Sequence, residues 1–181
     1  GFAATIFSSI IDSCYSTGNV TSQQNCGGFA GKILYSQITR CSSSGYTDGT
    51  GYVGGFAGYI GSSDVSECFT TSDVEGGSVV GGFVGYHTQT GSSIRNCYSM
   101  GNHVGTGYVG GFVETNTHNA SISHCYSCGA IPSGGGFAVL NNEGATITDC
   151  FWDTETSGQS SSAGGMGALT IEMQSMMLYT D

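Results

Sequence analysis

Short runs of apolar residues, separated by clusters of Gly, Ser, Asn and Asp, recur along the whole chain. Residues 55–60 (Gly-Phe-Ala-Gly-Tyr-Ile) and 93–98 (Ser-Ile-Arg-Asn-Cys-Tyr) are two examples. Runs of this length between turn-forming residues predict β-strands joined by turns. Helices are disfavoured because each stretch holds several Gly and many Ser or Thr, which cost a helix roughly 0.5 to 1 kcal/mol apiece.

The runs are organised as a repeat of about 27 residues. The first landmark is a Phe, preceded by a Gly pair in every repeat but the first, where a single Gly precedes it. The second is an Ile or Val three residues before a Cys, a spacing that never varies. The first landmark lies at Phe2, Phe29, Phe56, Phe83, Phe112 and Phe137, and the second at Ile11, Ile38, Val65, Ile94, Ile122 and Ile147.

This period is typical of a leucine-rich repeat or of a β-solenoid. Leu occurs at only four positions, which excludes the first. We therefore expect an all-β fold, a parallel β-solenoid (β-helix) of about six coils with two or three short strands each, stacked about 4.8 Å apart. The Phe and Ile/Val positions should form two internal core stacks, and the Gly pairs should serve either special turn dihedrals or close backbone approach. The expected coils lie near residues 1–26, 27–53, 54–80, 81–109, 110–133 and 134–158.

The segment 159–181 departs from the repeat. It begins as a Gly/Ser loop and continues into a predicted short helix, with Thr170 as its candidate N-cap. Such a helix would cover the open end of the stack. The start of the chain shows no comparable cap, because Gly1 and Phe2 already lie in register with the repeat.

Six of the eight cysteines occupy the same position in successive coils. Equivalent Cα atoms about 4.8 Å apart fall inside the roughly 4.4 to 6.8 Å range of a disulfide. Adjacent coils could then be joined in either of two phasings, beginning with Cys14–Cys41 or with Cys41–Cys68. The alternative is a ladder of buried free thiols. The disulfide candidates are Cys14, Cys41, Cys68, Cys97, Cys125 and Cys150.

Cys26 and Cys128 fall outside this ladder, in the first and fifth coils. They are too far apart along the stack to bond within one molecule. A bond between Cys26 of one molecule and Cys128 of the next would crosslink a head-to-tail fibre. Alternatively, Cys128 pairs with Cys125, or both thiols are free.

Composition and charge favour an extracellular or cell-surface protein. Charged residues make up 9% of the chain, against about a quarter in ordinary soluble domains, and eight cysteines suit an oxidising compartment. The net charge of −10 disfavours nucleic acid as a partner. No apolar run is long enough to predict a membrane span.

No residue pattern predicts catalysis, a metal or a cofactor. The three cations, Lys32, Arg40 and Arg95, are scattered over different coils, and no paired carboxylates or His-Glu-x-x-His pattern accompany them. The single Cys-x-x-Cys at 125–128 supplies too few ligands for structural zinc. We therefore expect a protein that is not an enzyme and holds no metal or cofactor.

Three segments carry a family resemblance: residues 81–86 (Gly-Gly-Phe-Val-Gly-Tyr), 93–102 (Ser-Ile-Arg-Asn-Cys-Tyr-Ser-Met-Gly-Asn) and 150–159 (Cys-Phe-Trp-Asp-Thr-Glu-Thr-Ser-Gly-Gln). With them the chain resembles the GLUG repeat, found in tandem in bacterial surface proteins, adhesins and some secreted peptidases. Phe replaces the usual Leu of that family after each Gly pair. The resemblance implies an extracellular, repetitive and non-catalytic protein.

Two functions remain open at this point. The first is a structural subunit of an extracellular fibre or cell-surface stalk that assembles end to end, with copies of itself (head to tail) or neighbouring domains of a longer chain as partners. The alternative is an adhesion or glycan-binding module within a longer surface protein. Its sugar-stacking candidates are Tyr46, Tyr52, Tyr59, Tyr86 and Tyr108. Asn19 and Asn119 begin N-glycosylation acceptor sequences.

Overall fold

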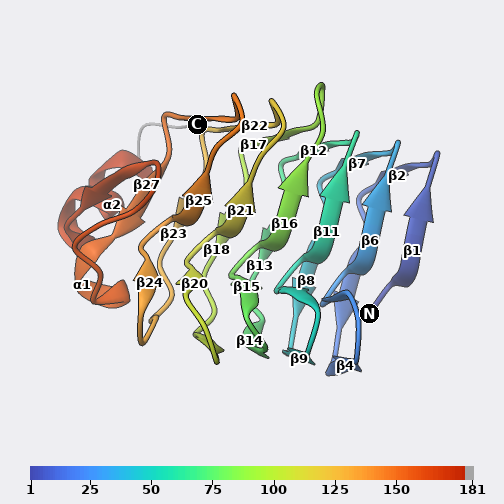
Figure 1. Cartoon of the computed structure of the whole chain (residues 1–181), viewed down its shortest axis with the longest axis horizontal. Helices are drawn as coiled ribbons and strands as arrows, with labels where there is room; N and C mark the ends of the chain where they lie inside the picture. Colours follow the sequence, from blue (N-terminus) through green and yellow to red (C-terminus); the bar gives the residue numbers. More distant parts are fainter. Residues whose placement is uncertain (178–181) are drawn as a thin grey trace.

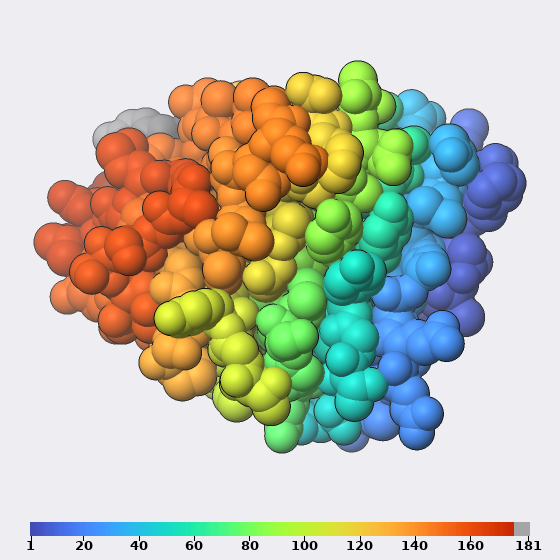
Figure 2. Space-filling model, viewed as in Figure 1, coloured from blue at the N-terminus to red at the C-terminus, as the bar shows by residue number. Residues whose placement is uncertain are grey.

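The computed structural model describes residues 1–177 and shows an all-β rod in which parallel strands lie side by side along the long axis (Figure 1). The chain passes through up to five narrow sheets in each circuit and then begins the next coil. This confirms the predicted β-solenoid of about six coils. In the space-filling view the coils succeed one another as bands of colour from the blue to the red end (Figure 2).

The strands of each sheet come from successive coils. The first sheet contains β1 (Ala3–Phe7), β6 (Ala30–Leu34), β11 (Ala57–Gly61), β16 (Val84–Thr88), β21 (Val113–Asn116) and β25 (Ala138–Asn141). The second contains β2 (Ile10–Asp12), β7 (Gln37–Thr39), β12 (Asp64–Ser66), β17 (Ser93–Arg95), β22 (Ser121–Ser123) and β26 (Thr146–Thr148). The third contains β3 (Tyr15–Thr17), β8 (Ser42–Ser44), β13 (Phe69–Thr70), β18 (Tyr98–Ser99), β23 (Tyr126–Ser127), β27 (Phe151–Asp153) and β28 (Met166–Ala168).

Two smaller sheets complete the coils. The fourth contains β4 (Val20–Ser22), β9 (Tyr46–Gly49), β14 (Asp73–Gly76) and β19 (His103–Gly105). The fifth contains β5 (Cys26–Gly27), β10 (Tyr52–Gly54), β15 (Val79–Gly81), β20 (Val109–Gly110) and β24 (Gly134–Gly135). The helices are α1 (Thr154–Ser157) and α2 (Thr170–Met177). Neither is long and apolar enough to cross a membrane, and no other helix occurs in residues 1–177.

The core consists of columns of equivalent residues. The six Phe rings of the repeat stack with centroids 4.8 Å apart and planes within 6° of parallel. The Ile/Val column is paired directly across the second sheet, as in Ile38 with Val65 and Val65 with Ile94. Both columns belong to one buried cluster, and a second cluster fills the space beside the fourth and fifth sheets. Coil stacking therefore buries the apolar residues that no single coil could cover.

Residues with positive φ set the corners of the coils. The residue before each ladder cysteine has φ between 50° and 54°; the six are Ser13, Arg40, Glu67, Asn96, His124 and Asp149. A second corner lies before the second sheet, where Ser8, Tyr35 and Ser62 have φ between 47° and 50°. These left-handed residues turn the chain after only a few residues. The coils consequently contain up to five short strands, more than the two or three we expected.

The Gly pairs before each Phe allow close approach between coils. A Cβ on Gly28 would lie 2.3 Å from the carbonyl oxygen of Gly55, and one on Gly55 would lie 2.4 Å from that of Gly82. None of these three has a positive φ. Of the two roles expected for the pairs, close backbone approach therefore explains them.

Candidate functional site

The six ladder cysteines lie in register, and their thiols take part in hydrogen bonds between coils. The backbone N–H of Cys41 donates to Sγ of Cys68 (3.3 Å), and that of Cys68 donates to Sγ of Cys97 (3.4 Å). Each thiol in turn donates to the carbonyl two residues before it, as Cys41 does to Thr39 (3.2 Å). All eight cysteines are free in the structure, so the predicted disulfides are not shown. Burial raises the pKa of the Cys125 thiol well above its ordinary value, which suits a packing role.

The two remaining cysteines lie in different surroundings. Cys26 has 1% of its surface exposed, and its thiol donates to the carbonyl of Asp48 (3.2 Å). Cys128 is half-buried, and burial, with a contribution from Asp153, raises its pKa to about 11. A bond from Cys26 to a second molecule would require the coil to open. This is a physical reason against the intermolecular crosslink considered from the sequence.

The first coil presents an open edge. Strands β1 to β5 each stand at the end of their sheet and pair on one side only. Phe2 stacks on Phe29 with one face and is 47% exposed, while Ile10 and Tyr15 are 81% and 75% exposed. The only charged side chain in residues 1–26 is Asp12, which forms an ion pair with Arg40. This end of the rod is therefore apolar, almost uncharged and rich in unpaired backbone groups.

The opposite end is covered by the segment that follows α1 (Figure 1). The hydroxyl of Ser162 accepts the N–H of Ala138 (2.8 Å) and of Phe137 (3.2 Å), so it takes the place of a further strand beside β25. Strand β28 adds to the third sheet beside β27, and α2 contacts β27. The cap thus satisfies backbone groups that the last coil would otherwise expose.

Asp153 holds the cap in place. Its carboxylate accepts the backbone N–H groups of Glu155 (2.9 Å) and Thr156 (3.1 Å) at the start of α1, and the hydroxyl of Thr170 (2.8 Å) at the start of α2. Burial by itself would raise the pKa of Asp153, but these hydrogen bonds together hold it below its ordinary value. Thr170, our candidate N-cap, is instead the first residue of α2. The carboxylate of Glu172 accepts the N–H of Leu169 (2.8 Å), which supplies part of the capping.

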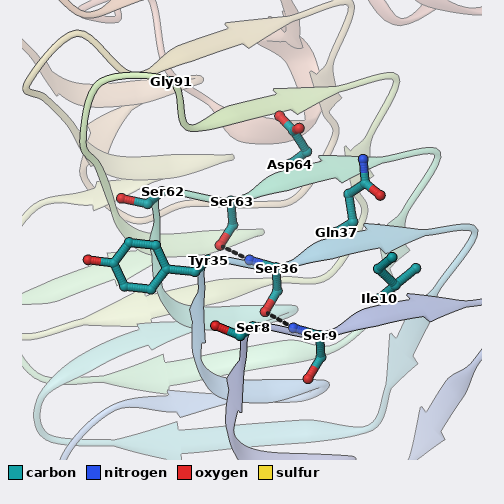
Figure 3. A pocket seen from close by; sticks show the side chains of 10 residues that line it. All are labelled: Ser8, Ser9, Ile10, Tyr35, Ser36, Gln37, Ser62, Ser63, Asp64 and Gly91. Atoms are coloured by element: carbon teal, nitrogen blue, oxygen red, sulfur yellow. Dashed lines mark hydrogen bonds between the residues drawn. The ribbon is translucent and has the colours of Figure 1, made fainter.

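A cleft follows the corner between the first and second sheets over the first three coils (Figure 3). Its volume is about 480 Å³. Equivalent residues form its sides and floor, because each column repeats from coil to coil. Ser8, Tyr35 and Ser62 form one side, Ile10, Gln37 and Asp64 the other, Ser9, Ser36 and Ser63 the floor, and Gly91 belongs to the loop at the fourth coil.

Our sequence analysis missed this cleft. The signal available was the alignment of Ser8-Ser9, Tyr35-Ser36 and Ser62-Ser63 at one repeat position. Which of those side chains point outward depends on the positive φ of the corner residues, and the residue types do not reveal it.

A comparison with known protein families gives a match that lies mostly in the fourth coil. The family model described as the GLUG motif matches residues 76–104, a segment that contains Phe83, Ile94 and Cys97. The chain carries a GLUG motif. This is consistent with a GLUG-repeat protein, and the landmarks of that coil recur in the others. No curated protein and no solved structure gives a significant match.

The GLUG-matched segment contains two fully buried histidines. His87 has partners on both ring nitrogens, Asn116 at 2.8 Å and Ser92 at 3.0 Å. Neither ring nitrogen of His103 has a hydrogen-bond partner. Burial lowers the pKa of each to about 4. Within residues 1–177 no group of three or more His, Cys, Asp or Glu side chains is arranged to hold a metal ion.

Most of the tyrosines proposed for sugar stacking pack against other residues. Tyr52 stacks on Tyr86 (4.9 Å between centroids), and Tyr59 stacks on Tyr86 (5.8 Å). Tyr46 donates its hydroxyl to Glu75, and Tyr108 is exposed. The two glycosylation candidates, Asn19 and Asn119, are both exposed.

Proposed function

We propose that this GLUG-motif chain is a non-catalytic structural segment of an extracellular fibre or surface stalk, extended end to end by pairing at its first coil. The observation that carries the proposal is the contrast between the two ends. The first coil has five edge strands, β1 to β5, that pair on one side only, and an exposed Phe2 ring, whereas the last coil is covered by β28 and α2. An open solenoid edge is a template for one more coil, whether that coil belongs to the same polypeptide or to a second copy.

The cap changes the expected mode of assembly. Head-to-tail contact between copies would require the segment after α1 to leave the last coil. Contact between two copies of the first coil requires no such movement, because within residues 1–177 its strands pair on one side only. Such a contact relates two identical surfaces by a twofold axis and closes as a pair, so a longer fibre or stalk would require the array to be continued by neighbouring parts of a longer polypeptide. The rods would then join end to end with the Phe columns aligned and the caps at the outer ends.

Analytical ultracentrifugation tests the proposal. We expect a concentration-dependent pair whose formation is promoted by salt, because each chain carries a net charge of −10. Ile10→Lys places a charge on the open edge and should abolish pairing. Ile171→Lys, at an exposed apolar position on the capped end, is the matched control and should pair normally. Equal loss in both variants would contradict pairing at the first coil.

The tyrosines on which the adhesion alternative was based give it little support. Tyr52 and Tyr59 each stack on Tyr86, so part of the aromatic surface of these three residues is already covered. A surface with an uncovered aromatic face would suit a saccharide better.

A further inference from the structure

The cleft over the first three coils has a rigid floor whose hydrogen bonds are already satisfied. The hydroxyl of Ser36 donates to the carbonyl of Leu34 (2.7 Å) and accepts the N–H of Ser9 (3.1 Å). Ser63 repeats this arrangement one coil on, donating to Gly61 (2.9 Å) and accepting from Ser36 (3.1 Å). These serines hold the coils in register and leave the floor fixed before any ligand arrives.

The sides of the cleft, in contrast, carry polar groups that are free to bind a ligand. The hydroxyls of Ser8 and Ser62 and the carboxamide of Gln37 make no hydrogen bond to any described residue. Asp64 accepts one hydrogen bond, from Ser93 (2.5 Å) to Oδ1, and its other oxygen remains available. Donors and acceptors therefore line both sides of the cleft; Figure 3 shows Gln37 and Asp64 on one side of the serine floor and Ser62 and Tyr35 on the other, with the Tyr35 ring directed away from Gln37 and Asp64.

Tyr35 supplies an aromatic surface on the same side of the cleft as Ser62. Its side chain is 62% exposed, and its only ring contact within residues 1–177 is an edge contact with Phe7 (5.5 Å between centroids, 75° between planes). One ring face remains open for a ligand. This distinguishes Tyr35 from Tyr52, Tyr59 and Tyr86, whose faces are stacked.

Charge narrows the class of ligand. Asp64 is the only charged residue among the ten that line the cleft, and no lining residue is Lys, Arg or His. An anionic ligand would meet a carboxylate and no cation, in the field of a chain of net charge −10. A ligand with many hydroxyls and one apolar face matches the combination of free acceptors, free donors and an open aromatic ring.

We propose that the cleft binds a neutral oligosaccharide that crosses the serine floor, with one sugar ring stacked on Tyr35 and the hydroxyls of a neighbouring sugar hydrogen-bonded to Gln37 and Asp64. The cleft volume of about 480 Å³ lies within the range of roughly 300 to 1,000 Å³ that small-molecule sites occupy. The loop around Gly91 in the fourth coil borders the cleft.

An array of neutral glucose, galactose, mannose and N-acetylglucosamine oligomers, with acidic glycans alongside, provides the first test. Titration calorimetry with the best neutral oligomer then compares variants. Tyr35→Ala and Asp64→Asn should each weaken binding by about tenfold or more, which corresponds to about 1.4 kcal/mol. Tyr15→Ala, an exposed tyrosine on the third sheet, and Asp149→Asn, an exposed carboxylate outside the cleft, are the matched controls and should bind normally.

The proposal is overturned if no neutral oligomer binds, if only acidic glycans bind, or if both cleft variants bind as the unaltered chain does. Circular dichroism of each variant establishes that the fold is kept. Ile10 lies both on the open edge and in the cleft, so the two proposals are separated by Tyr35→Ala and Asp64→Asn, which lie in the second and third coils and should leave pairing unchanged in the ultracentrifuge. A chain that pairs without binding saccharide, or the reverse, distinguishes the two proposals.

Discussion

At the residue scale, His103 shows how one side chain can make the stability of a whole coil depend on pH. Its ring replaces the apolar Val74 of the preceding coil at the same register position, with both nitrogens unpaired. An unpaired buried polar group is costly, and burial, offset in part by Asp73, lowers its pKa to about 4 from 6.5. Between these two values the unfolded chain binds more protons than the folded chain, so stability falls as the pH drops.

We predict that lowering the pH from 7 to 4 removes up to about 3 kcal/mol through His103 alone. His103→Val should raise stability at neutral pH and flatten that part of the pH dependence. Chemical denaturation at pH 7, 6, 5 and 4 measures both effects. Val104→Ala, at the exposed neighbouring position of β19, removes no titratable group and is the control, which should leave the pH dependence unchanged. A His103→Val chain with the original slope would contradict the account.

The cysteine ladder allows a second prediction at this scale. If the buried cysteines are thiols, as in the structure, titration of the unfolded, unreduced protein should find eight thiols per chain. In the folded protein Cys14, which is only half-buried, should react first, while Cys41 and Cys68 should react only on unfolding. A count of two, four or six thiols after unfolding would instead establish disulfides between coils.

Some of these residue-level features could be predicted from the sequence and others could not. Phe83 and Ile94 were predictable because an apolar column must repeat at every coil. The corner residues Arg40 and Glu67 were not, since neither type favours a positive φ and only the coil geometry imposes it. The burial of His87 and His103 was not predictable for the same reason, because no local sequence signal shows that a polar side chain faces inward.

At the scale of the element, the Phe column carries the packing between coils. Phe83 is fully buried between the rings of Phe56 and Phe112. We predict that Phe83→Ala costs about 3 to 5 kcal/mol and that Phe83→Leu costs about 1 kcal/mol. Phe2→Ala should cost less than half as much as Phe83→Ala, because Phe2 has one ring neighbour and is exposed. Equal losses at the two positions, measured by denaturation, would argue against a continuous stack.

The C-terminal cap is the other element whose stability rests on few residues. Asp153→Asn removes the charge that accepts the hydrogen bonds from Glu155, Thr156 and Thr170. We expect a loss of about 2 kcal/mol, with faster amide hydrogen exchange in 159–177 and little change in the first three coils. The ordinary pKa of a carboxyl of this type is about 3.9, and that of Asp153 is lower in the folded chain. Its contribution is therefore complete above the ordinary value and is lost as the pH falls through the folded one.

Asp149→Asn, at an exposed carboxylate four residues earlier, is the control for this experiment. Exchange that accelerates equally in both variants, or equally across all coils, would contradict the role of Asp153. The existence of a C-terminal helix was predictable from residues 168–178. The part played by Asp153 was not, because it joins two segments that are 17 residues apart in sequence.

At the scale of the whole molecule, the repeat period determines how the coils stack but does not determine the structure of the two ends. The repeat of Phe and Ile/Val landmarks was enough to predict the stack, because equivalent residues in a solenoid must align. The head-to-tail assembly expected from the uncapped start stays a prediction, and the cover that β28 and α2 form on the last coil is the feature that stands against it. The cleft is likewise a property of three coils together, so no single repeat predicts it.

Small-angle X-ray scattering of the chain over a range of concentrations tests the central claim most directly, since it reports length and cross-section separately. Our account predicts that the length of the particle roughly doubles with concentration while its cross-section stays constant, and that Ile10→Lys prevents the change. A particle that stays single at every concentration, or that grows in cross-section instead of length, would contradict an end-to-end structural role.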